Sequence, residues 1–401
     1  MKKKVAIEGF VAPGYEEVAE AFQQNFVKDE ELGAAFAVVK DGEAVVDIWG
    51  GLANRETQAP WTRDTLQLIF SGSKGLLATI MLMLIDRRLL ELDAPVSRYW
   101  PEFGKDDILI RHIVSHTARL PGNSEPLTIA DLIDSAGMSA RLARQAPSAD
   151  PRAALCYHPL NFGWLSGEII RHVSGRTAGR FLADEIARPL SLDLWIGLPE
   201  SVDERTSTLY LGSNWGIAPF FSPTLWAHDP LVESIWGNPP LWGDPVKWEP
   251  DNFPWNRRAF RAAEMPGANA IGSARSIAAL YGVLATGGGP LLSSEALALG
   301  RRAVADGLDE VHGNRLRTGV GYQLQTELRA LGPPEGAFGH TGAGGSSHGA
   351  WPELGVGFSY AMNLMQDPTS GDQRAPRLLT ALHESITSRS RRRGRGTAAR
   401  Q

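Results

Sequence analysis

Strand patterns near both ends of the chain, with helical patterns between them, constrain the fold more than any other feature of the sequence. Residues 34–39 and 44–49 are two apolar runs joined by Asp41-Gly42. That dipeptide favours a tight hairpin turn because glycine accepts a positive φ. The apolar runs within residues 355–365 also resemble strands more than helices. We therefore expect a sheet built from both ends of the chain, with a mainly helical lobe inserted between them.

Apolar residues recur at helical spacing through much of the remaining sequence. The predicted helices span residues 13–28, 74–88, 108–116, 161–174, 177–187, 273–285 and 376–387. The helix at 74–88 is apolar nearly all round and should be buried. These patterns divide the chain into a sheet domain (1–75 and 290–387), a mainly helical domain (76–289) and a basic tail (388–401). The tail has no apolar face and is predicted to be solvated or disordered.

Residues 214–255 combine many prolines with little periodicity. Their tryptophans are Trp215, Trp226, Trp236, Trp242, Trp248 and Trp255. Long irregular segments are usually functional or disordered, and this aromatic content argues against disorder. The segment is interpreted either as a wall facing a substrate or as a loop that caps the core.

Bulk properties exclude several classes of partner. The chain has 401 residues, 43% apolar content and a net charge of -5, which gives no electrostatic reason to bind nucleic acid or a membrane. No window approaches the roughly 20 apolar residues of a membrane span. Glu8 interrupts the apolar run after the initial lysines, so a signal peptide is not predicted and a cytoplasmic location is expected. The single cysteine, Cys156, is interpreted as a small core residue rather than a nucleophile.

The first candidate for chemistry is Ser71-Gly72-Ser73-Lys74, directly before the apolar helix. If the helix begins near Ser71, the Ser71 and Lys74 side chains lie one turn apart on the same face. A serine hydroxyl needs a base to remove its proton, and a lysine is a base only where its neutral form is accessible. Burial of Lys74 beside the apolar helix could make its neutral form accessible. The alternative is a helix-capping serine beside a surface lysine.

Two further segments could complete such a site. Tyr157 could serve as a general base if a neighbouring ammonium lowered its pKa from about 10; the alternative is a core or capping tyrosine. The segment 339–345, Gly-His-Thr-Gly-Ala-Gly-Gly, crowds glycines into a predicted strand. A bare strand edge can offer a backbone N–H to a carbonyl oxygen, although a glycine-rich turn is also possible. His340 and His348 lack a third ligand at useful spacing, so neither a metal nor a cofactor is predicted.

Taken in order, these segments resemble the serine β-lactamase and D-alanyl-D-alanine peptidase superfamily, and most closely its family VIII carboxylesterases. The Ser-x-x-Lys motif is Ser71 to Lys74, the tyrosine motif is Tyr157, and the third motif is His340-Thr341-Gly342. Flanking segments at 113–117, 163–168 and 274–278 also resemble the family, and the likeness runs from about Gly33 to Asn363.

The resemblance implies an α+β fold of the serine β-lactamase type, with an antiparallel sheet flanked by helices. It implies a carboxylesterase in which Ser71 attacks the acyl carbon of a small-molecule ester. Lys74 and Tyr157 would share the proton transfers from Ser71 and to the leaving alcohol, and which of the two is the general base is left open. The backbone N–H groups of Ser71 and Ala343 would hold the oxyanion, with Gly342 and His340 beside the substrate. A β-lactamase, amidase, acyltransferase or catalytically silent relative remains the alternative.

One position departs from the family pattern. β-Lactamases and peptidases of this kind usually carry Tyr-x-Asn, whereas Pro159 stands at the Asn position here. Proline has no side-chain amide to bind a β-lactam or peptide amide. Asn161 lies two residues further along the chain, so we expect deacylation of a β-lactam adduct to be poor. The departure therefore favours an esterase.

A second serine motif allows the nucleophile to be tested. Gly345-Ser346-Ser347-His348-Gly349 matches Gly-x-Ser-x-Gly, but the segment after it does not resemble the helix that this motif requires. We predict that Ser71→Ala abolishes hydrolysis of a nitrophenyl ester, whereas Ser347→Ala keeps most of it. The opposite pattern of rates would assign the nucleophile to Ser347 and overturn the fold prediction as well.

Overall fold

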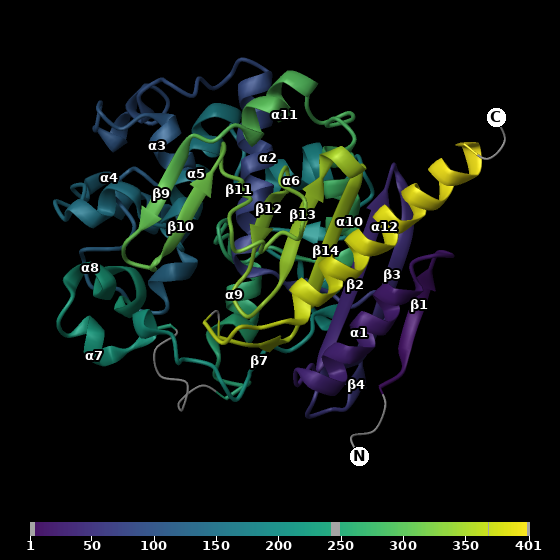
Figure 1. Ribbon diagram of the computed structural model, residues 1–401. Coiled ribbons are helices and arrows are strands. Elements are labelled where there is room, and N and C mark those ends of the chain that lie inside the picture. The colour runs from purple at the N-terminus through teal and green to yellow at the C-terminus, as the bar shows by residue number, and fades with distance from the viewer. Residues whose placement is uncertain (1–4, 242–248, 368, 399–401) are drawn as a thin grey trace.

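A ten-stranded sheet organises the computed structural model, which describes residues 5–241, 249–367 and 369–398 (Figure 1). The antiparallel strand order is β1-β3-β2-β14-β13-β12-β11-β10-β9, with β4 paired to β3. The strands are β1 (Ile7–Val11), β2 (Gly33–Lys40), β3 (Glu43–Asn54), β4 (Ala59–Pro60), β9 (Ala305–Asp309), β10 (Asn314–Thr318), β11 (Gln323–Leu324), β12 (Phe338–Thr341), β13 (Ser347–Trp351) and β14 (Val356–Met362). Both ends of the chain therefore contribute to one sheet, as predicted.

The predicted hairpin is β2–β3, and its turn residues Asp41 and Gly42 have φ values of 50° and 87°. Its first strand carries different residues on its two faces. Phe36 and Val38 pack in the same apolar cluster as helices α1 (Glu16–Lys28) and α12 (Arg374–Ala398). Ala37 packs on the opposite face against helix α10 (Ala274–Ala285). Helices thus cover both faces of the sheet.

Helix α10 packs closer to the sheet than an ordinary side-chain layer would allow. A Cβ on Gly357 of β14 would lie 2.0 Å from the backbone nitrogen of Gly282 on α10. Helix α10 also contributes Ile277 and Leu280 to the apolar core that surrounds α2, so it packs against both layers, and the predicted boundary at residue 289 stays a prediction. Its amphipathic pattern predicts a helix but does not say which layer receives its apolar face.

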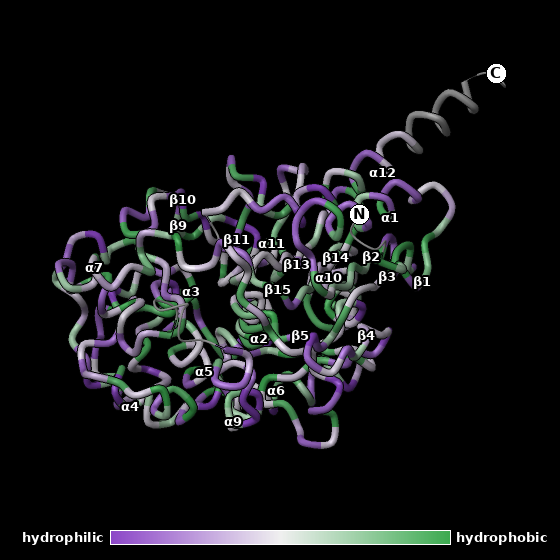
Figure 2. The backbone as a smooth tube through the Cα atoms, turned by 90° about the horizontal axis from the view of Figure 1, so that it is seen from below, coloured by the Kyte–Doolittle hydropathy of each residue, from purple (hydrophilic) through white to green (hydrophobic). Residues whose placement is uncertain are grey.

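The helical lobe surrounds α2 (Ser73–Asp86), whose residues from Ser73 to Leu84 are all buried. Figure 2 shows α2 as a strongly hydrophobic segment inside the molecule. The other helices are α3 (Ile110–Val114), α4 (Ser135–Arg144), α5 (Asn161–Ser174), α6 (Ala178–Leu182), α7 (Pro223–Trp226), α8 (Pro230–Val232), α9 (Arg258–Ala262) and α11 (Ser294–Arg301). Short strand pairs join β5 (Gln67–Leu68) and β6 (Leu194–Trp195) to β8 (Ile271–Gly272), and β7 (Tyr210–Leu211) to β15 (Leu364–Met365).

The tryptophan-rich segment folds onto the lobe through short helices. Trp215, Trp226, Trp236 and Trp255 are all buried in the apolar core of the lobe. Trp242 and Trp248 lie outside the described residues. Both interpretations of the segment apply, because Trp215 and Trp236 also line the main cavity described below.

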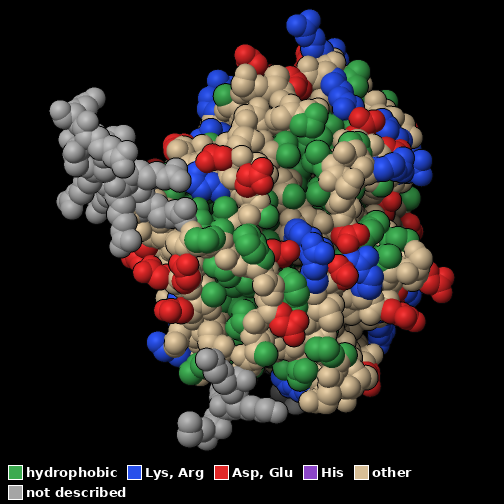
Figure 3. All heavy atoms as spheres, turned by 90° about the vertical axis from the view of Figure 1, so that its right-hand side faces the viewer, with side chains coloured by type: hydrophobic (Ala, Val, Ile, Leu, Met, Phe, Trp, Pro, Cys, Tyr) green, Lys and Arg blue, Asp and Glu red, His purple; other side chains and the backbone are tan. Residues whose placement is uncertain are grey.

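Helix α12 continues to Ala398 instead of ending near residue 387. This extends helix into the stretch predicted to be a disordered tail, and residues 399–401 lie outside the described part. Each residue added to an existing helix gains one hydrogen bond without a new nucleation cost. A helix can therefore continue past the end of its apolar pattern, and that pattern alone does not predict where it ends. In the described residues, none of the helices is both long and apolar enough to span a membrane. On the face shown in Figure 3, acidic and basic side chains are interspersed.

Candidate active site

Ser71 lies in a single 3-10 turn, Phe70–Gly72, that leads directly into α2. The preceding residue, Phe70, has a φ of 46°, which an ordinary side chain rarely adopts. Packing maintains this conformation, because Phe70 is buried and its ring meets Trp255 edge-on with centroids 5.2 Å apart. The sharp bend places the Ser71 hydroxyl at the start of a helix, where backbone N–H groups favour negative charge.

Lys74 lies in the first turn of α2 and has no exposed surface. Its Nζ is 3.1 Å from Ser71 Oγ, 2.6 Å from the carbonyl oxygen of Pro159 and 2.8 Å from that of Gly267. Burial lowers the pKa of this amine well below its usual value near 10.5, because the charged form loses its hydration. The sequence-based expectation that burial would make a neutral lysine accessible fits this environment.

Tyr157 reaches the same point from the segment before α5. Its hydroxyl donates a hydrogen bond of 2.7 Å to Ser71 Oγ, and Lys74 Nζ lies 4.9 Å from the centre of its ring. The three predicted residues therefore converge on one small volume. Burial raises the pKa of the Tyr157 phenol instead of lowering it, which opposes the phenolate that a general base at this position would need.

The glycine-rich segment forms the end of β12 and the turn after it. A Cβ on Gly342 would lie 2.3 Å from the carbonyl oxygen of Ile69, so the strand edge runs directly beside the bend that carries Ser71. Gly342 and Ala343 line the same cavity as Ser71. His340 is buried there, and burial lowers its pKa to about 3, so its ring is neutral at pH 7.

Asn161 does not replace the missing amide beside the site. Its side chain is buried at the start of α5 and donates to the carbonyl oxygens of Leu120 (2.9 Å) and Gly122 (3.0 Å), while its own oxygen accepts from Asn123. Pro159 contributes only its backbone carbonyl, which accepts from Lys74. Neither residue supplies the amide of the Tyr-x-Asn pattern.

The reacting groups open into a cavity of about 310 Å³. Its apolar wall includes Trp215, Phe220, Phe221, Trp236, Leu316 and Leu328. The Phe220 and Trp236 rings stack with centroids 5.2 Å apart. Large apolar pockets with a few converging polar groups are the usual form of small-molecule sites.

Asp309 and His312 join this cavity, and the sequence analysis missed both. The Asp309 carboxylate accepts from the Tyr157 backbone N–H (2.8 Å) and is 2.7 Å from His312 Nδ1. His312 Nε2 in turn accepts from the indole N–H of Trp236 at 3.1 Å. These contacts tie the Tyr157 backbone to the aromatic wall. No local motif signals them, because Asp309 follows Tyr157 by 152 positions.

Cys156, Asp309 and His312 bring potential metal ligand atoms within 4.8 Å of one another in the described part of the chain. Both ring nitrogens of His312 are already engaged. Burial also raises the pKa of the Cys156 thiol, which opposes the thiolate that a metal requires. The group is better explained as support for Tyr157, and Cys156 is a buried residue as predicted.

The second serine motif has a different geometry. Ser347 begins strand β13 instead of preceding a helix, and its buried hydroxyl donates to the carbonyl oxygen of Ala330 at 3.1 Å. A nucleophile elbow needs a strand-to-helix turn that exposes the hydroxyl. The structure therefore agrees with rejecting this motif.

Comparison with known proteins now identifies the class. Residues 18–383 match the β-lactamase family, and the chain belongs to that family. It is 31% identical over 385 residues to "Esterase/beta-lactamase LipL" of Mycobacterium tuberculosis, covering 90% of this chain and 83% of that protein. A solved family VIII carboxylesterase is 36% identical and superposes with a TM-score of 0.83, covering 95% of this chain and all of the other. A penicillin-binding protein homologue from Caulobacter crescentus is 35% identical, with the same TM-score and the same coverage.

Buried histidines give this site a pH signature. Burial lowers the pKa of His340 and His348 to about 3 and that of His158 to about 4, against about 6.5 in the unfolded chain. Between those values the unfolded state binds more protons, so the free energy of unfolding should fall as the pH drops through 6.5. We expect a loss of about 1 kcal/mol per buried histidine between pH 7 and 5.5, measured by urea unfolding.

The variant His348→Asn removes one such group without altering the cavity lining. It should reduce the pH dependence of unfolding over the same interval. A free energy of unfolding that is constant from pH 7 to 5.5 in the wild type would contradict this prediction.

Proposed function

We propose that this protein is a serine carboxylesterase that hydrolyses short-to-medium acyl esters through an acyl-enzyme on Ser71. The observation that carries the proposal is the position of Ser71 Oγ, 3.1 Å from Lys74 Nζ and 2.7 Å from the Tyr157 hydroxyl, at an apolar cavity. The esterase names of LipL and of the family VIII structure support the same reaction class. A cytoplasmic location remains part of the proposal.

The hydrogen-bond inventory favours Lys74 as the base. A neutral amine has two N–H groups and one lone pair. The carbonyl oxygens of Pro159 and Gly267 can take the two N–H groups, which leaves the lone pair for the Ser71 proton. Tyr157 keeps its own proton because burial raises its pKa, and it already donates toward Ser71 Oγ. Tyr157 is therefore proposed to protonate the departing alcohol.

The backbone N–H groups of Ser71 and Ala343 are proposed to hold the oxyanion. Ser71 contributes the start of a helix, and Ala343 contributes the turn after β12 on the same cavity wall. Removal of one such donor typically costs about 10²–10³ in rate, because the donors are fixed before charge develops. Gly342 gives the turn room to approach Ile69.

Three observations favour an ester over a β-lactam as substrate. Pro159 provides no amide, Asn161 is engaged in the fold, and His340 is neutral where many β-lactamases carry a lysine. A neutral ring offers no full charge to a substrate carboxylate. The aromatic wall suits an apolar acyl or alcohol group instead.

The substrate class is tested by comparing nitrophenyl esters of increasing acyl length with a chromogenic cephalosporin. We expect kcat/KM for the acetate-to-octanoate esters to exceed that for the cephalosporin by at least about a thousandfold, since a missing amide contact costs several kcal/mol. Comparable turnover of the cephalosporin would favour a β-lactamase. A chain that neither turns over an ester nor reacts with a fluorophosphonate would be a silent relative.

The two proton-transfer roles are tested by the leaving group. Lys74→Met should slow acylation by about 10²–10⁴ for every ester, because no base remains for Ser71. Tyr157→Phe should slow alkyl esters far more than nitrophenyl esters, since nitrophenolate leaves without a proton. Single-turnover acylation rates measure both effects.

Tyr322→Phe is the matched control, since Tyr322 is a buried tyrosine whose hydroxyl pairs with Thr79 away from the cavity. It should leave both rates unchanged. Equal losses on both ester types in Tyr157→Phe would reassign Tyr157 to the first proton transfer.

A further inference from the structure

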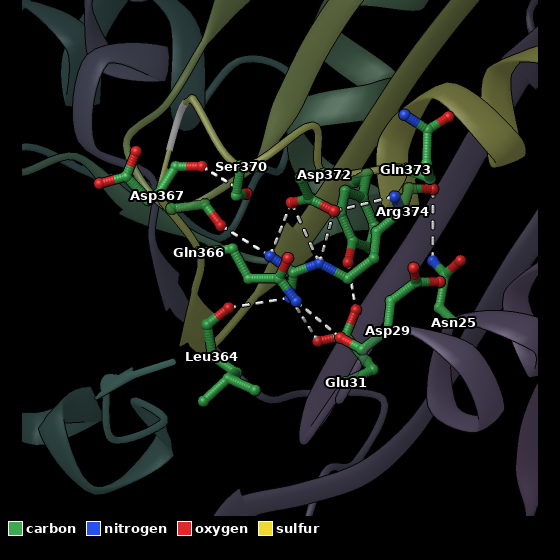
Figure 4. A network of polar contacts seen from close by, with 12 residues as sticks. Asn25, Asp29, Glu31, Leu364, Gln366, Asp367, Ser370, Asp372, Gln373 and Arg374 are labelled. Carbon is green, nitrogen blue, oxygen red and sulfur yellow. Dashed lines mark hydrogen bonds and ion pairs between the residues drawn. The ribbon is translucent and has the colours of Figure 1, made fainter. Parts of the chain in front are cut away.

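A buried arginine lies behind the glycine-rich turn, outside the reacting groups. Arg374 stands at the start of α12, and neither its side chain nor that of its ion-pair partner Glu31 has exposed surface (Figure 4). Burying charge costs free energy that is recovered only through well-placed partners. The partners of this guanidinium therefore indicate what it stabilises.

Every N–H group of the Arg374 guanidinium has an acceptor. Nη1 donates to Glu31 Oε1 (3.1 Å) and to the carbonyl oxygen of Leu364 (2.8 Å). Nη2 donates to Asp372 Oδ2 (2.8 Å) and to the carbonyl oxygen of Gly344 (2.7 Å). Nε donates to the Asp372 carboxylate at 3.0 Å. Only a planar fork can satisfy so many acceptors at once, which makes the contact with Gly344 highly directional.

Gly344 belongs to the turn that presents Ala343 to the cavity. The Gly345 N–H donates to the Gly342 carbonyl oxygen at 3.2 Å, which closes a four-residue turn with Ala343 and Gly344 as its central residues. Gly344 has a φ of 88°, as the third residue of such a turn often requires. Its carbonyl oxygen also accepts from the Gln366 N–H at 3.0 Å. Arg374 and Gln366 thus donate two hydrogen bonds that fix the peptide group between Gly344 and Gly345.

The opposite side of the guanidinium is anchored in the sheet. Glu31 accepts from the hydroxyl of Tyr360 on β14 as well as from Arg374. A Cβ on Gly345 would lie 2.8 Å from Arg374 Nη2 and 2.3 Å from Asp372 Oδ2, so a larger residue would displace the fork from the turn. The arginine thereby connects the central strands to the turn through fixed contacts.

We propose that Arg374 is a positioning residue that holds the 342–345 turn and sets the direction of the Ala343 N–H toward the substrate oxyanion. This inference rests on the proposed function of that N–H. Arg374 contacts no reacting atom and acts only through Gly344. Its loss should weaken stabilisation of the transition state more than binding of the substrate.

The test is Arg374→Lys, which keeps one positive charge between Glu31 and Asp372 but cannot satisfy Gly344 as well. We expect kcat for a nitrophenyl ester to fall by about 10–100-fold while KM changes by less than about threefold, since a displaced donor costs less than a deleted one. Affinity for an alkyl trifluoromethyl ketone, whose adduct with Ser71 carries an oxyanion, should fall by the same factor as kcat/KM.

Arg377→Lys is the matched control. Arg377 lies on the same helix and donates to Asn25 of α1 and to Asp29, the residue that follows α1. It does not contact the 342–345 turn. It should alter thermal stability and leave kcat unchanged. If Arg374→Lys lowers stability but matches Arg377→Lys in kcat and in ketone affinity, the arginine is purely structural and the inference is wrong.

Two further outcomes, a variant that does not fold and a wild type without activity, can be told apart from failure of this inference. Should Arg374→Lys fail to fold, Asp372→Asn keeps the arginine and Glu31 but loosens one side of the fork. A several-fold lower kcat at constant KM then supports the inference, and an unchanged kcat overturns it. Absence of Ser71-dependent turnover in the wild type would instead refute the proposed function, which the same assay detects before any variant is compared.

Discussion

The burial of one lysine side chain decides the chemistry that this fold can perform. Lys74 stands in the first turn of α2, and the lobe encloses it completely. Two backbone carbonyls and the Ser71 hydroxyl are its polar neighbours, and none of them is a carboxylate. Without a counter-charge, desolvation dominates and the amine is held toward its neutral form. The apolar helix that builds the core of the lobe therefore also prepares the base.

The same arrangement explains the direction of the other titrations. Desolvation by burial also drives Tyr157 and His340 toward their neutral forms. A neutral phenol keeps its proton, and a neutral imidazole exerts no strong field on the substrate. Tyr157 and His340 are thus uncharged at neutral pH, whereas Asp309, Arg315 and Arg317 contribute charged side chains to the lining of the same cavity.

Much of the fold and of the candidate site was predictable because the relevant signals are local. The Asp41-Gly42 hairpin and the apolar helix are local patterns, and the structure contains both. Ser71 and Lys74 lie one turn apart, so spacing alone predicts their approach. The pairing of Tyr157 with them depended on family resemblance, since no local pattern joins residues 86 positions apart.

What was missed depends on long-range packing. Asp309 and His312 support Tyr157 from the β9–β10 hairpin, and Arg374 reaches Gly344 across 30 positions. Burial raises the pKa of Tyr157, and no sequence pattern shows how far that side chain is removed from water. Sequence spacing shows that two groups can meet, but only the surrounding packing decides which of them keeps its charge.

The fully buried ion pair of Arg374 and Glu31 stands behind the turn and not in the cavity. The Arg374 guanidinium is compensated there by its ion pairs with Glu31 and Asp372 and by backbone acceptors, although burial raises the pKa of Glu31. If these groups faced the substrate, the carboxylates would repel the oxyanion, and the guanidinium would act on the bound substrate as well as on the transition state. Separated from it by the glycine turn, they can fix the backbone without binding the substrate. The fixed charge of Arg374 thus acts on the reaction only through the backbone, by setting the direction of an N–H group that is proposed to receive the oxyanion.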